Sequence, residues 1–474
     1  MFRYPWTNLH ELNLGWALHK LKELSDDGDC VFVRPEEFPE SSNPVADAVQ
    51  KAADDGKMVL LSGVYDVPET ITVPQGMIII GTNNAELVSM QQNLPGFCPT
   101  TIFSMESNTI VYNVVFNGNR PDGASQSIIP SDLQPGETFG RAPLVLIQDC
   151  DTVSFSRCIF KKYDSNRTSA NPWMHAVVGA QNSVFINMDR CLMFDCYREG
   201  FNFTDCGLIT ISGCYFSMQG QSLDVYTEIG LLNTDEVLIE SCQILKADGV
   251  TTSLINAMGN DITIKDCYLY SKSSVYGVDY GNEIEAGFSC SNLLIKNCRI
   301  HCHINAKSTV DLVAAHDNVV LDGCEIDGSE IDNQAGVVYV VGYAGEHFEI
   351  TNCHFYGTLS APVYDAIRIA PGTSTNTIIS GCVFDQRAIW LNGSSTGLVI
   401  KDNVFNARVI TQEAVLDTAE YLKIIGCQYT SNNRFGTGPA GCLMEIILIG
   451  CSFRVGTTTS DNITVDSSLS YVGP

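Results

Sequence analysis

The stretch VLIESCQI, residues 237–244, is one of the clearest copies of a pattern that recurs along most of this 474-residue chain. Its first half alternates apolar and polar residues up to Ile239, as a half-buried strand does. Simple alternation would then place Ser241 inside, yet Cys242 and Ile244 recur as the next apolar pair. A corner of two residues between Ile239 and Cys242 restores the phase. Each copy is therefore predicted to be a strand, a sharp corner and a second strand, with a further short strand before them.

The position of Cys242 holds cysteine in most copies of the pattern. Asn403 takes this position in IKDNVF, and Val114 takes it in an earlier copy, VYNVVF. With Asn403 counted, successive copies from Cys158 onward lie 21 to 33 residues apart. Such self-similarity predicts stacked repeats, each unable to bury its apolar face alone. The repeat cysteines are Cys158, Cys191, Cys214, Cys242, Cys267, Cys298, Cys324, Cys353, Cys382, Cys427 and Cys451.

The repeat length and composition predict an all-β fold. Three short strands per turn of about 25 residues, rich in β-branched side chains, are typical of a single-stranded parallel β-helix, here with about 12–14 rungs and a short helical N-terminal segment. A leucine-rich repeat has a denser leucine signature, and a propeller needs about 40 residues per blade. No 3.6-residue apolar period supports an α-solenoid.

Cysteine at the corner has a packing explanation. It is small, apolar and readily buried, so a column of reduced thiols on rungs about 4.8 Å apart is predicted. Disulfides are the competing interpretation, because that spacing falls within the range that a bridge permits. Side chains in a column point the same way, however, and the total of 19 cysteines is odd. Reduced, structural thiols are therefore expected.

The chain is expected to divide into four segments. The first is a leader with a helical apolar stripe, the second a capping helix with the first rung, the third the β-helix with one long insertion, and the last a C-terminal tail. An insertion of that length is usually functional or disordered. These segments are residues 1–34, 35–82, 83–454 (insertion 119–141) and 455–474.

Charge and missing motifs exclude several classes of function. The formal net charge of −27 argues against binding to nucleic-acid phosphates or to anionic membranes. No stretch of sequence is apolar enough to span a bilayer, and no signal-peptide pattern opens the chain. No CxxC pairs recur at metal-ligand spacing, so neither a metal nor a cofactor is expected. His301 and His303 are interpreted as alternating on one exposed strand rather than as a metal site.

A resemblance to a known family supports the fold. PVADAVQKAADDGKMVLLSGVYDVPETITVPQGMIIIGTN, residues 44–83, resembles the opening of pectin-lyase-like right-handed β-helix proteins. The resemblance implies a short capping helix from Val45 to Asp54, then a strand and turn from Leu60 to Tyr65. It also implies that the helix is right-handed. It predicts no particular activity, because unrelated functions share this scaffold.

The leader resembles another class of protein. PWTNLHELNLGWALHKLKEL, residues 5–24, is similar to leader segments of structural proteins from tailed phages. The resemblance implies a virion protein that is made in the host cytoplasm, docks to other virion proteins through residues 1–34, and commonly forms a homotrimer. A cap packed on the first rung is the alternative. The expected docking residues are Phe2, Tyr4, Trp6, Leu9, Leu12 and Trp16.

Outward side chains of successive rungs are expected to line a groove. In the pectinase-type proteins that this chain resembles, catalytic carboxylates lie on the strand before the corner. Here those strands are expected to include SLDVYTE, residues 222–228, and GVDYGNE, residues 277–283. Asn202 on GFNF, Tyr226 and the other polar or aromatic residues of this face suit sugar binding, because sugars are held by aromatic faces and planar polar groups. The expected glycan-binding residues are Tyr197, Asn202, Tyr226, Tyr276 and Asn282.

Two aspartates are the first candidates for catalysis. Alternation places Asp224 and Asp279 outward, two rungs or about 10 Å apart, near the upper limit for an inverting glycosidase pair. Glu228 and Glu283 add carboxylates at the strand ends. A chance cluster is the competing interpretation, because the chain has 54 acidic residues.

The expected function is therefore that of a tailed-phage appendage, a tail spike or a tail or head fibre, that adsorbs to host surface polysaccharide. One alternative is a glycan depolymerase, hydrolase or lyase, on the same scaffold. The others are a purely structural decoration protein and a free bacterial polysaccharide enzyme.

Overall fold

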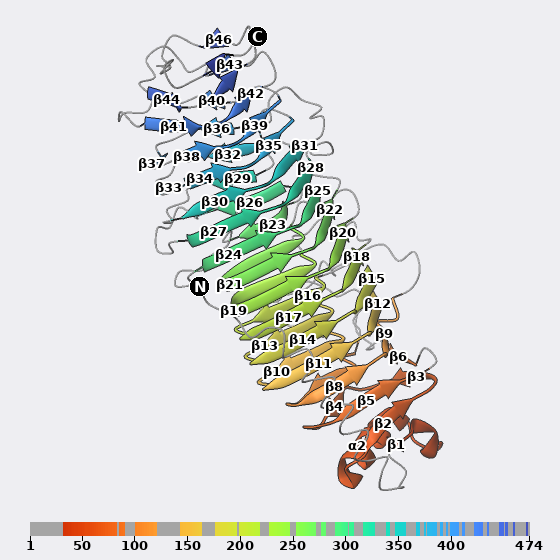
Figure 1. The fold of residues 1–474 in the computed structure, drawn as a ribbon. Coiled ribbons are helices and arrows are strands. Elements are labelled where there is room, and N and C mark those ends of the chain that lie inside the picture. The colour runs from red at the N-terminus through yellow and green to blue at the C-terminus, as the bar shows by residue number, and fades with distance from the viewer. Residues whose placement is uncertain are drawn as a thin grey trace, which may run out of the picture. The chain divides into compact units, whose positions relative to one another are not determined.

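The computed structural model shows short parallel strands stacked in successive rungs (Figure 1). The chain forms two units, Met1–Tyr215 and Phe216–Pro474, which are described separately. The expected docking residues of the leader lie outside the described part of the chain. The described residues are 32–82, 85–90, 100–120, 143–163, 176–196, 199–218, 227–246, 253–271, 276–280, 290–301, 303–307, 316–327, 338–341, 347–356, 366–369, 374–375, 377–385, 389–391, 395–396, 399–406, 410–412, 421–429, 434–435, 445–449, 451–453, 458–459 and 471–472.

The helix α2 (Pro44–Asp55) covers the start of the first unit, as the resemblance implied. It begins where the Asn43 side chain accepts a hydrogen bond from the Ala46 amide at 3.2 Å, with Pro44 in the first turn. It ends at Gly56, whose φ of 65° is readily adopted without a Cβ. The preceding segment holds β1 (Phe32–Val33) and the short 3-10 helix η1 (Pro35–Glu37). The helix buries Val45, Ala48, Val49 and Ala52.

Each rung of the first unit has up to three strands, and each strand pairs in parallel with its counterpart one rung away. First and second strands belong to one sheet, sheet A, and third strands to another, sheet B. First strands are β4 (Ile71–Val73), β7 (Phe103–Met105), β10 (Val145–Gln148), β13 (Val178–Gln181) and β16 (Phe201–Thr204). Second strands are β2 (Met58–Leu61), β5 (Ile78–Gly81), β8 (Thr109–Tyr112), β11 (Thr152–Ser156), β14 (Phe185–Asp189) and β17 (Leu208–Ser212). Third strands are β3 (Val64–Val67), β6 (Glu86–Ser89), β9 (Val115–Asn117), β12 (Ile159–Tyr163), β15 (Leu192–Cys196) and β18 (Tyr215–Met218).

The second unit repeats this plan, and β19 (Ile229–Glu240) and β21 (Ile255–Lys265) run through both the first and second strand positions. Further first strands are β23 (Tyr276–Tyr280), β26 (His303–Lys307), β29 (Val338–Val341), β32 (Ile367–Ile369), β36 (Ile389–Leu391), β40 (Ile410–Gln412), β43 (Arg434–Phe435) and β46 (Thr458–Thr459). Further second strands are β24 (Cys290–Lys296), β27 (His316–Asp322), β30 (Phe348–Thr351), β34 (Thr377–Ser380), β38 (Val399–Lys401), β41 (Tyr421–Ile425) and β44 (Glu445–Ile449). Third strands are β20 (Gln243–Lys246), β22 (Tyr268–Ser271), β25 (Arg299–His301), β28 (Glu325–Asp327), β31 (His354–Tyr356), β35 (Val383–Phe384), β39 (Val404–Phe405), β42 (Gln428–Tyr429), β45 (Ser452–Phe453) and β47 (Tyr471–Val472). A separate small pair is β33 (Ser374–Thr375) and β37 (Ser395–Thr396).

The corner predicted between the second and third strands is present in both units. The residue directly before the repeat cysteine has a left-handed backbone, with φ of 55° at Ser241 and 52° at Asn297. This conformation turns the chain within two residues and restores the inward phase that Cys242 needs. Nine of the twelve described corner residues are Gly, Asn or Asp, which tolerate positive φ best, and the other three are Arg157, Arg190 and Ser241. The corner residues are Asn113, Arg157, Arg190, Gly213, Ser241, Asp266, Asn297, Gly323, Asn352, Gly381, Asp402 and Gly426.

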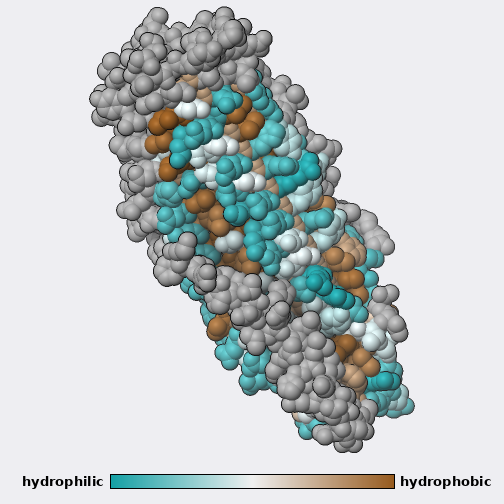
Figure 2. All heavy atoms as spheres, viewed as in Figure 1, coloured by the Kyte–Doolittle hydropathy of each residue, from teal (hydrophilic) through white to brown (hydrophobic). Residues whose placement is uncertain are grey.

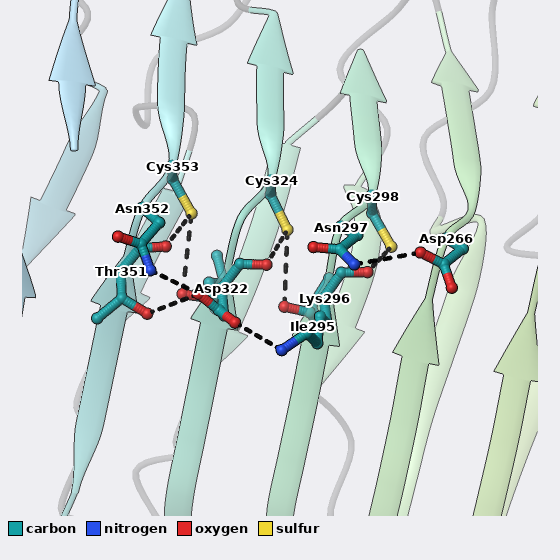
Figure 3. Close-up of polar contacts among 11 residues, drawn as sticks. Asp266, Ile295, Lys296, Asn297, Cys298, Asp322, Cys324, Thr351, Asn352 and Cys353 are labelled. Carbon is teal, nitrogen blue, oxygen red and sulfur yellow. Dashed lines mark hydrogen bonds and ion pairs between the residues drawn. The ribbon is translucent and has the colours of Figure 1, made fainter. Parts of the chain in front are cut away.

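The predicted cysteine column is confirmed in each unit, because every repeat cysteine is buried and unbridged. Each described thiol also has hydrogen-bonding partners that the sequence did not reveal. The Cys324 Sγ lies 3.6 Å from the carbonyl oxygen of Asp322 and 3.6 Å from that of Ile295 on the neighbouring rung. In Figure 3 the sulfurs of Cys298, Cys324 and Cys353 point the same way. A weak S–H donor thus meets a buried acceptor on each rung.

The prediction that His301 and His303 alternate on one exposed strand is wrong. His301 ends the third strand β25 in sheet B, and His303 begins the first strand β26 in sheet A. His301 is also largely covered, with 12% of its side chain exposed. The two histidines thus lie on different strands, so an alternation counted from one to the other has no structural meaning.

Candidate functional site

Backbone pairing in the second unit aligns one residue per rung on the outer side of the first strands. Asn256 pairs with Asp279, which in turn pairs with Asn305. Val278 and Tyr280, on either side of Asp279, lie in the core with 0% and 1% exposure. The aligned positions therefore belong to the opposite face of sheet A, and we call them the outer column. They are Gly230, Asn256, Asp279, Asn305, Tyr339, Arg368, Trp390 and Thr411.

Asp279 lies on the predicted side of its strand but not in the predicted environment. It is 5% exposed, whereas the sequence predicted an exposed carboxylate. Alternation along a strand determines which face a side chain occupies. It does not determine whether other parts of the chain cover that face. Asp279 is therefore a shielded carboxylate among residues of the outer column.

The expected pairing of Asp224 with Asp279 across two rungs stays a prediction, and only the neighbouring register is described. The first strand of that rung begins at Ile229, beyond the expected segment 222–228, and Gly230 holds the position two rungs before Asp279. Asp224 and Glu283 themselves lie outside the described residues. Glu228 directly precedes β19 and is 1% exposed, so the structure places it in a buried position rather than at an open strand end.

Asn202 has the best-described surroundings of the expected glycan-binding residues. It lies on β16 of the first unit and is 3% exposed. Its Nδ2 donates to the Glu199 carboxylate at 3.0 Å, and its Oδ1 accepts from the Thr204 hydroxyl at 3.0 Å. Tyr276 begins β23, where only the backbone is described. Tyr197, Tyr226 and Asn282 lie outside the described residues.

Sequence reasoning missed a cluster on the outer face of sheet B in the second unit. Tyr268 and Tyr270 lie on β22, and their ring centroids are 6.3 Å apart. The His301 ring, one rung away, lies 5.5 Å from Tyr268 and 5.8 Å from Tyr270. Its Nδ1 is 3.1 Å from the Asp327 carboxylate. We call these four residues the tyrosine–histidine patch. Its members come from three rungs, so no local motif signals it.

A second polar cluster lies at the corner between sheets A and B of the same unit (Figure 3). The Lys296 ammonium is 2.9 Å from Asp322, which also accepts from Asn352 at 3.0 Å and from Thr351 at 3.1 Å. The hydrogen bond from Lys296, followed by that from Asn352, holds the pKa of Asp322 below its usual value. Every member of the cluster has its partners within it, and the cluster joins neighbouring rungs. We therefore regard it as structural.

The described residues offer few further sites. Among them, no group of three or more histidine, cysteine, aspartate or glutamate side chains is arranged to hold a metal ion. No helix in the described part of the chain is long and apolar enough to cross a membrane. On the face drawn in Figure 2, hydrophilic residues cover much of the described surface, and hydrophobic residues form separate small groups.

Comparison with known proteins identifies the fold. The family model described as "Right handed beta helix region" matches residues 144–310. No curated protein sequence matches the chain. Among solved structures, the chain is similar to the Dettilon tailspike protein, with 12% identity and a TM-score of 0.40 over 92% of this chain and 69% of that one. It is similar to the tailspike protein of E. coli bacteriophage HK620 solved with a pentasaccharide, with 11% identity and a TM-score of 0.41 over 89% and 76%.

A third similar structure belongs to an enzyme. It is the catalytic domain of a GH87 alpha-1,3-glucanase in complex with nigerose, with 10% identity and a TM-score of 0.37, and the match covers 90% of this chain and 66% of that domain. At such identities these similarities concern the fold alone. The family model that matches residues 144–310 and the parallel rungs together identify a right-handed parallel β-helix.

Proposed function

We propose that this protein is a virion appendage of a tailed phage, a spike or fibre, that adsorbs to host surface polysaccharide through its outer column. The observation that carries the proposal is the register of the column in the second unit. Each rung, about 4.8 Å from the next, contributes one residue to the same line. From Asn256 to Trp390 these residues are amides, a carboxylate, a phenol, a guanidinium and an indole. These are the groups that hold sugar hydroxyls and ring faces.

The geometry of the column suits a polymer better than a small molecule. A glycan chain lying along the stacking direction of the second unit would meet one outer-column residue at each rung. Along its length the aromatic positions Tyr339 and Trp390 would alternate with the hydrogen-bonding positions Asn305 and Arg368. The negative charge of the whole chain disfavours an anionic polymer. The polysaccharide is therefore proposed to be neutral or only weakly acidic.

Attachment to the particle is proposed to use residues 1–34, which resemble phage leader segments. Self-association as a homotrimer belongs to the same proposal. Deleting residues 1–24 should abolish incorporation of the protein into particles and leave the β-helix folded. Normal incorporation of the truncated protein would contradict the docking role.

Glycan cleavage is a second candidate function, favoured by one observation. Asp279 and Glu228 are 5% and 1% exposed, and glycosidases use carboxyl groups shielded from water as general acids. Release of reducing ends from polysaccharide purified from the host envelope tests this candidate. Loss of the release in both Asp279→Asn and Glu228→Gln would support a depolymerase. Absence of release by the unaltered protein would exclude hydrolysis, and a parallel assay for unsaturated ends would test a lyase.

Adsorption itself is tested by binding of the same polysaccharide to the full-length protein. Trp390→Ala and Arg368→Ala should each weaken binding about tenfold, the effect of losing roughly 1.4 kcal/mol of contact. Arg299→Ala, on sheet B, is the matched control for Arg368→Ala and should bind normally. Equal affinity of all three variants would contradict a role for the outer column.

A further inference from the structure

The outer face of sheet B in the second unit carries aromatic and ionisable groups that the proposed function does not use. Leu269 and Ile300 alternate with the patch residues and are 0% exposed, so Tyr268, Tyr270 and His301 lie on the opposite face of the sheet. Tyr270 and His301 occupy the same position on adjacent rungs. Two phenol rings and one imidazole ring therefore form a compact group on this outer face.

Asp327 determines the chemistry of the imidazole ring. A carboxylate only accepts hydrogen bonds, so the Nδ1 of His301, 3.1 Å from Asp327, must carry a proton. In the neutral ring the Nε2 is then an acceptor. Among the described residues nothing donates a hydrogen bond to this Nε2, although it is buried. Buried acceptors are normally satisfied, and an orphaned one in a functional setting indicates a missing donor.

The other histidine–carboxylate pair of this face is different. There the carboxylate contacts the other ring nitrogen, because the Nε2 of His354 lies 2.8 Å from Asp385. The side chains of both residues are also far more open, at 45% and 39% exposure. His354 also has an aromatic neighbour, Tyr356, with ring centroids 5.1 Å apart. The pair at His301 differs in its burial, in the two tyrosine rings beside it, and in a buried Nε2 that has no hydrogen-bond partner among the described residues.

We propose that the tyrosine–histidine patch binds a neutral pyranose sugar, as a site separate from the outer column. The apolar face of the sugar would lie on a tyrosine ring, and a sugar hydroxyl would donate to the Nε2 of His301. That nitrogen is buried in this structure, and the rings of Tyr268 and Tyr270 lie beside the imidazole, so the proposal includes the turning of one of these rings to another rotamer. The proposal depends neither on a phage origin nor on the outer column.

The test follows the His301 imidazole in the full-length protein by nitrogen-15 NMR, with the signal assigned by its loss in His301→Phe. The probes are the methyl glycosides of glucose, galactose, mannose and N-acetylglucosamine at millimolar concentration. At least one is expected to shift the Nε2 resonance in a saturable way. Tyr270→Ala should raise the half-saturation concentration about tenfold, while His354→Asn should leave it unchanged.

Two results would overturn the proposal: no shift with any of the four glycosides, or equal half-saturation in Tyr270→Ala and the unaltered protein. Circular dichroism of Tyr270→Ala verifies that the variant is folded. Trp390→Ala separates this site from the outer column. That variant should bind the envelope polysaccharide about tenfold more weakly if the proposed function is correct, and it should keep the His301 shift in either case.

Discussion

Asn403 shows what the interior corner position requires of a residue. It replaces the repeat cysteine and is 0% exposed. Its Nδ2 donates to the Ile379 carbonyl at 2.9 Å, and its Oδ1 accepts from the Cys382 amide at 2.8 Å. A cysteine such as Cys382 offers only a weak S–H donor, 3.6 Å from the Ile350 carbonyl. On these two rungs the side chain donates to a carbonyl of the neighbouring rung, and asparagine does so with the stronger bond. Val114, 0% exposed in an earlier copy, shows that the position requires a side chain that fits the interior but does not require a donor.

Replacing Asn403 should be far more harmful than replacing its cysteine neighbour. Asn403→Leu leaves the buried Cys382 amide and the buried Ile379 carbonyl without their hydrogen-bond partner, at a cost of about 1–3 kcal/mol each. We expect a loss of about 2–4 kcal/mol in the free energy of unfolding, measured by urea denaturation. Cys382→Val removes only a weak S–H contact and should lose less than about 1 kcal/mol. Equal losses in the two variants would show that packing alone determines this position.

Asp322 should make the folded protein less stable at low pH. Hydrogen bonds from Lys296 and Asn352 hold its pKa below the usual value, so the folded state favours the carboxylate. The free energy of unfolding that ionised Asp322 contributes is fully present above the unfolded pKa of about 3.9. It is lost as pH falls through the lower pKa of the folded state. Asp322→Asn should therefore reduce the loss of stability below about pH 4, measured by thermal unfolding across pH. Lys296→Met should have the same effect, and a steeper loss in either variant would contradict the assignment.

At the scale of the elements, the residue at one corner restricts which residue the corner of the next rung can hold. A Cβ built on Gly381 would lie 2.7 Å from the Oδ1 of Asn352, the corner residue of the preceding rung. Likewise, a Cβ built on Gly323 would lie 2.7 Å from the Oδ1 of Asn297, the corner residue of the rung before it. At these two corners glycine follows asparagine because the asparagine amide fills the space that the next side chain would need. The left-handed φ of 66° at Gly381 adds a second reason for glycine.

Substitution of the corner glycine separates these two effects. Gly381→Ala should lose stability through both the left-handed backbone, about 1–2 kcal/mol, and the clash with Asn352. Gly56→Ala is the matched control, because Gly56 has φ of +65° and nothing within 4 Å of the added Cβ. In urea denaturation, Gly56→Ala should lose less free energy of unfolding than Gly381→Ala. Adding Asn352→Ala to Gly381→Ala should recover part of the difference, and no recovery would exclude the clash.

The sequence predicted some of these elements well and others poorly, for physical reasons. The second and third strands are separated by a two-residue corner, so the phase of Cys242 reveals both of them. First strands have no such marker, and β19 consequently begins at Ile229 rather than in the expected segment 222–228. The tyrosine–histidine patch was not predictable, because His301 and Asp327 meet through rung stacking and lie far apart in sequence.

For the whole molecule, the most general property is a set of buried, reduced thiols within each unit. Burial raises the pKa of Cys206 in the first unit to about 12 and that of Cys290 in the second to about 11. The unfolded thiol ionises near pH 8.5, at about the value of a free cysteine. A thiol whose folded pKa is raised contributes fully below the unfolded pKa and loses its contribution as pH rises towards the folded value.

The protein should accordingly be sensitive to alkali. Its melting temperature should fall between about pH 8.5 and the folded pKa of about 12 at Cys206. Cys206→Ala removes one such group and should make this decline shallower, although it lowers stability at pH 7 through the cavity it creates. An unchanged pH slope in Cys206→Ala would contradict a shielded thiol at that position.

Pulsed alkylation with iodoacetamide, read residue by residue by mass spectrometry, tests the interior column most directly. The account predicts that the repeat cysteines, Cys158 to Cys451, stay unmodified in the native protein and become fully modified in denaturant without prior reduction. Rapid native labelling along the series, or labelling in denaturant only after reduction, would mean exposed or bridged cysteines and would contradict the stacked β-helix described above.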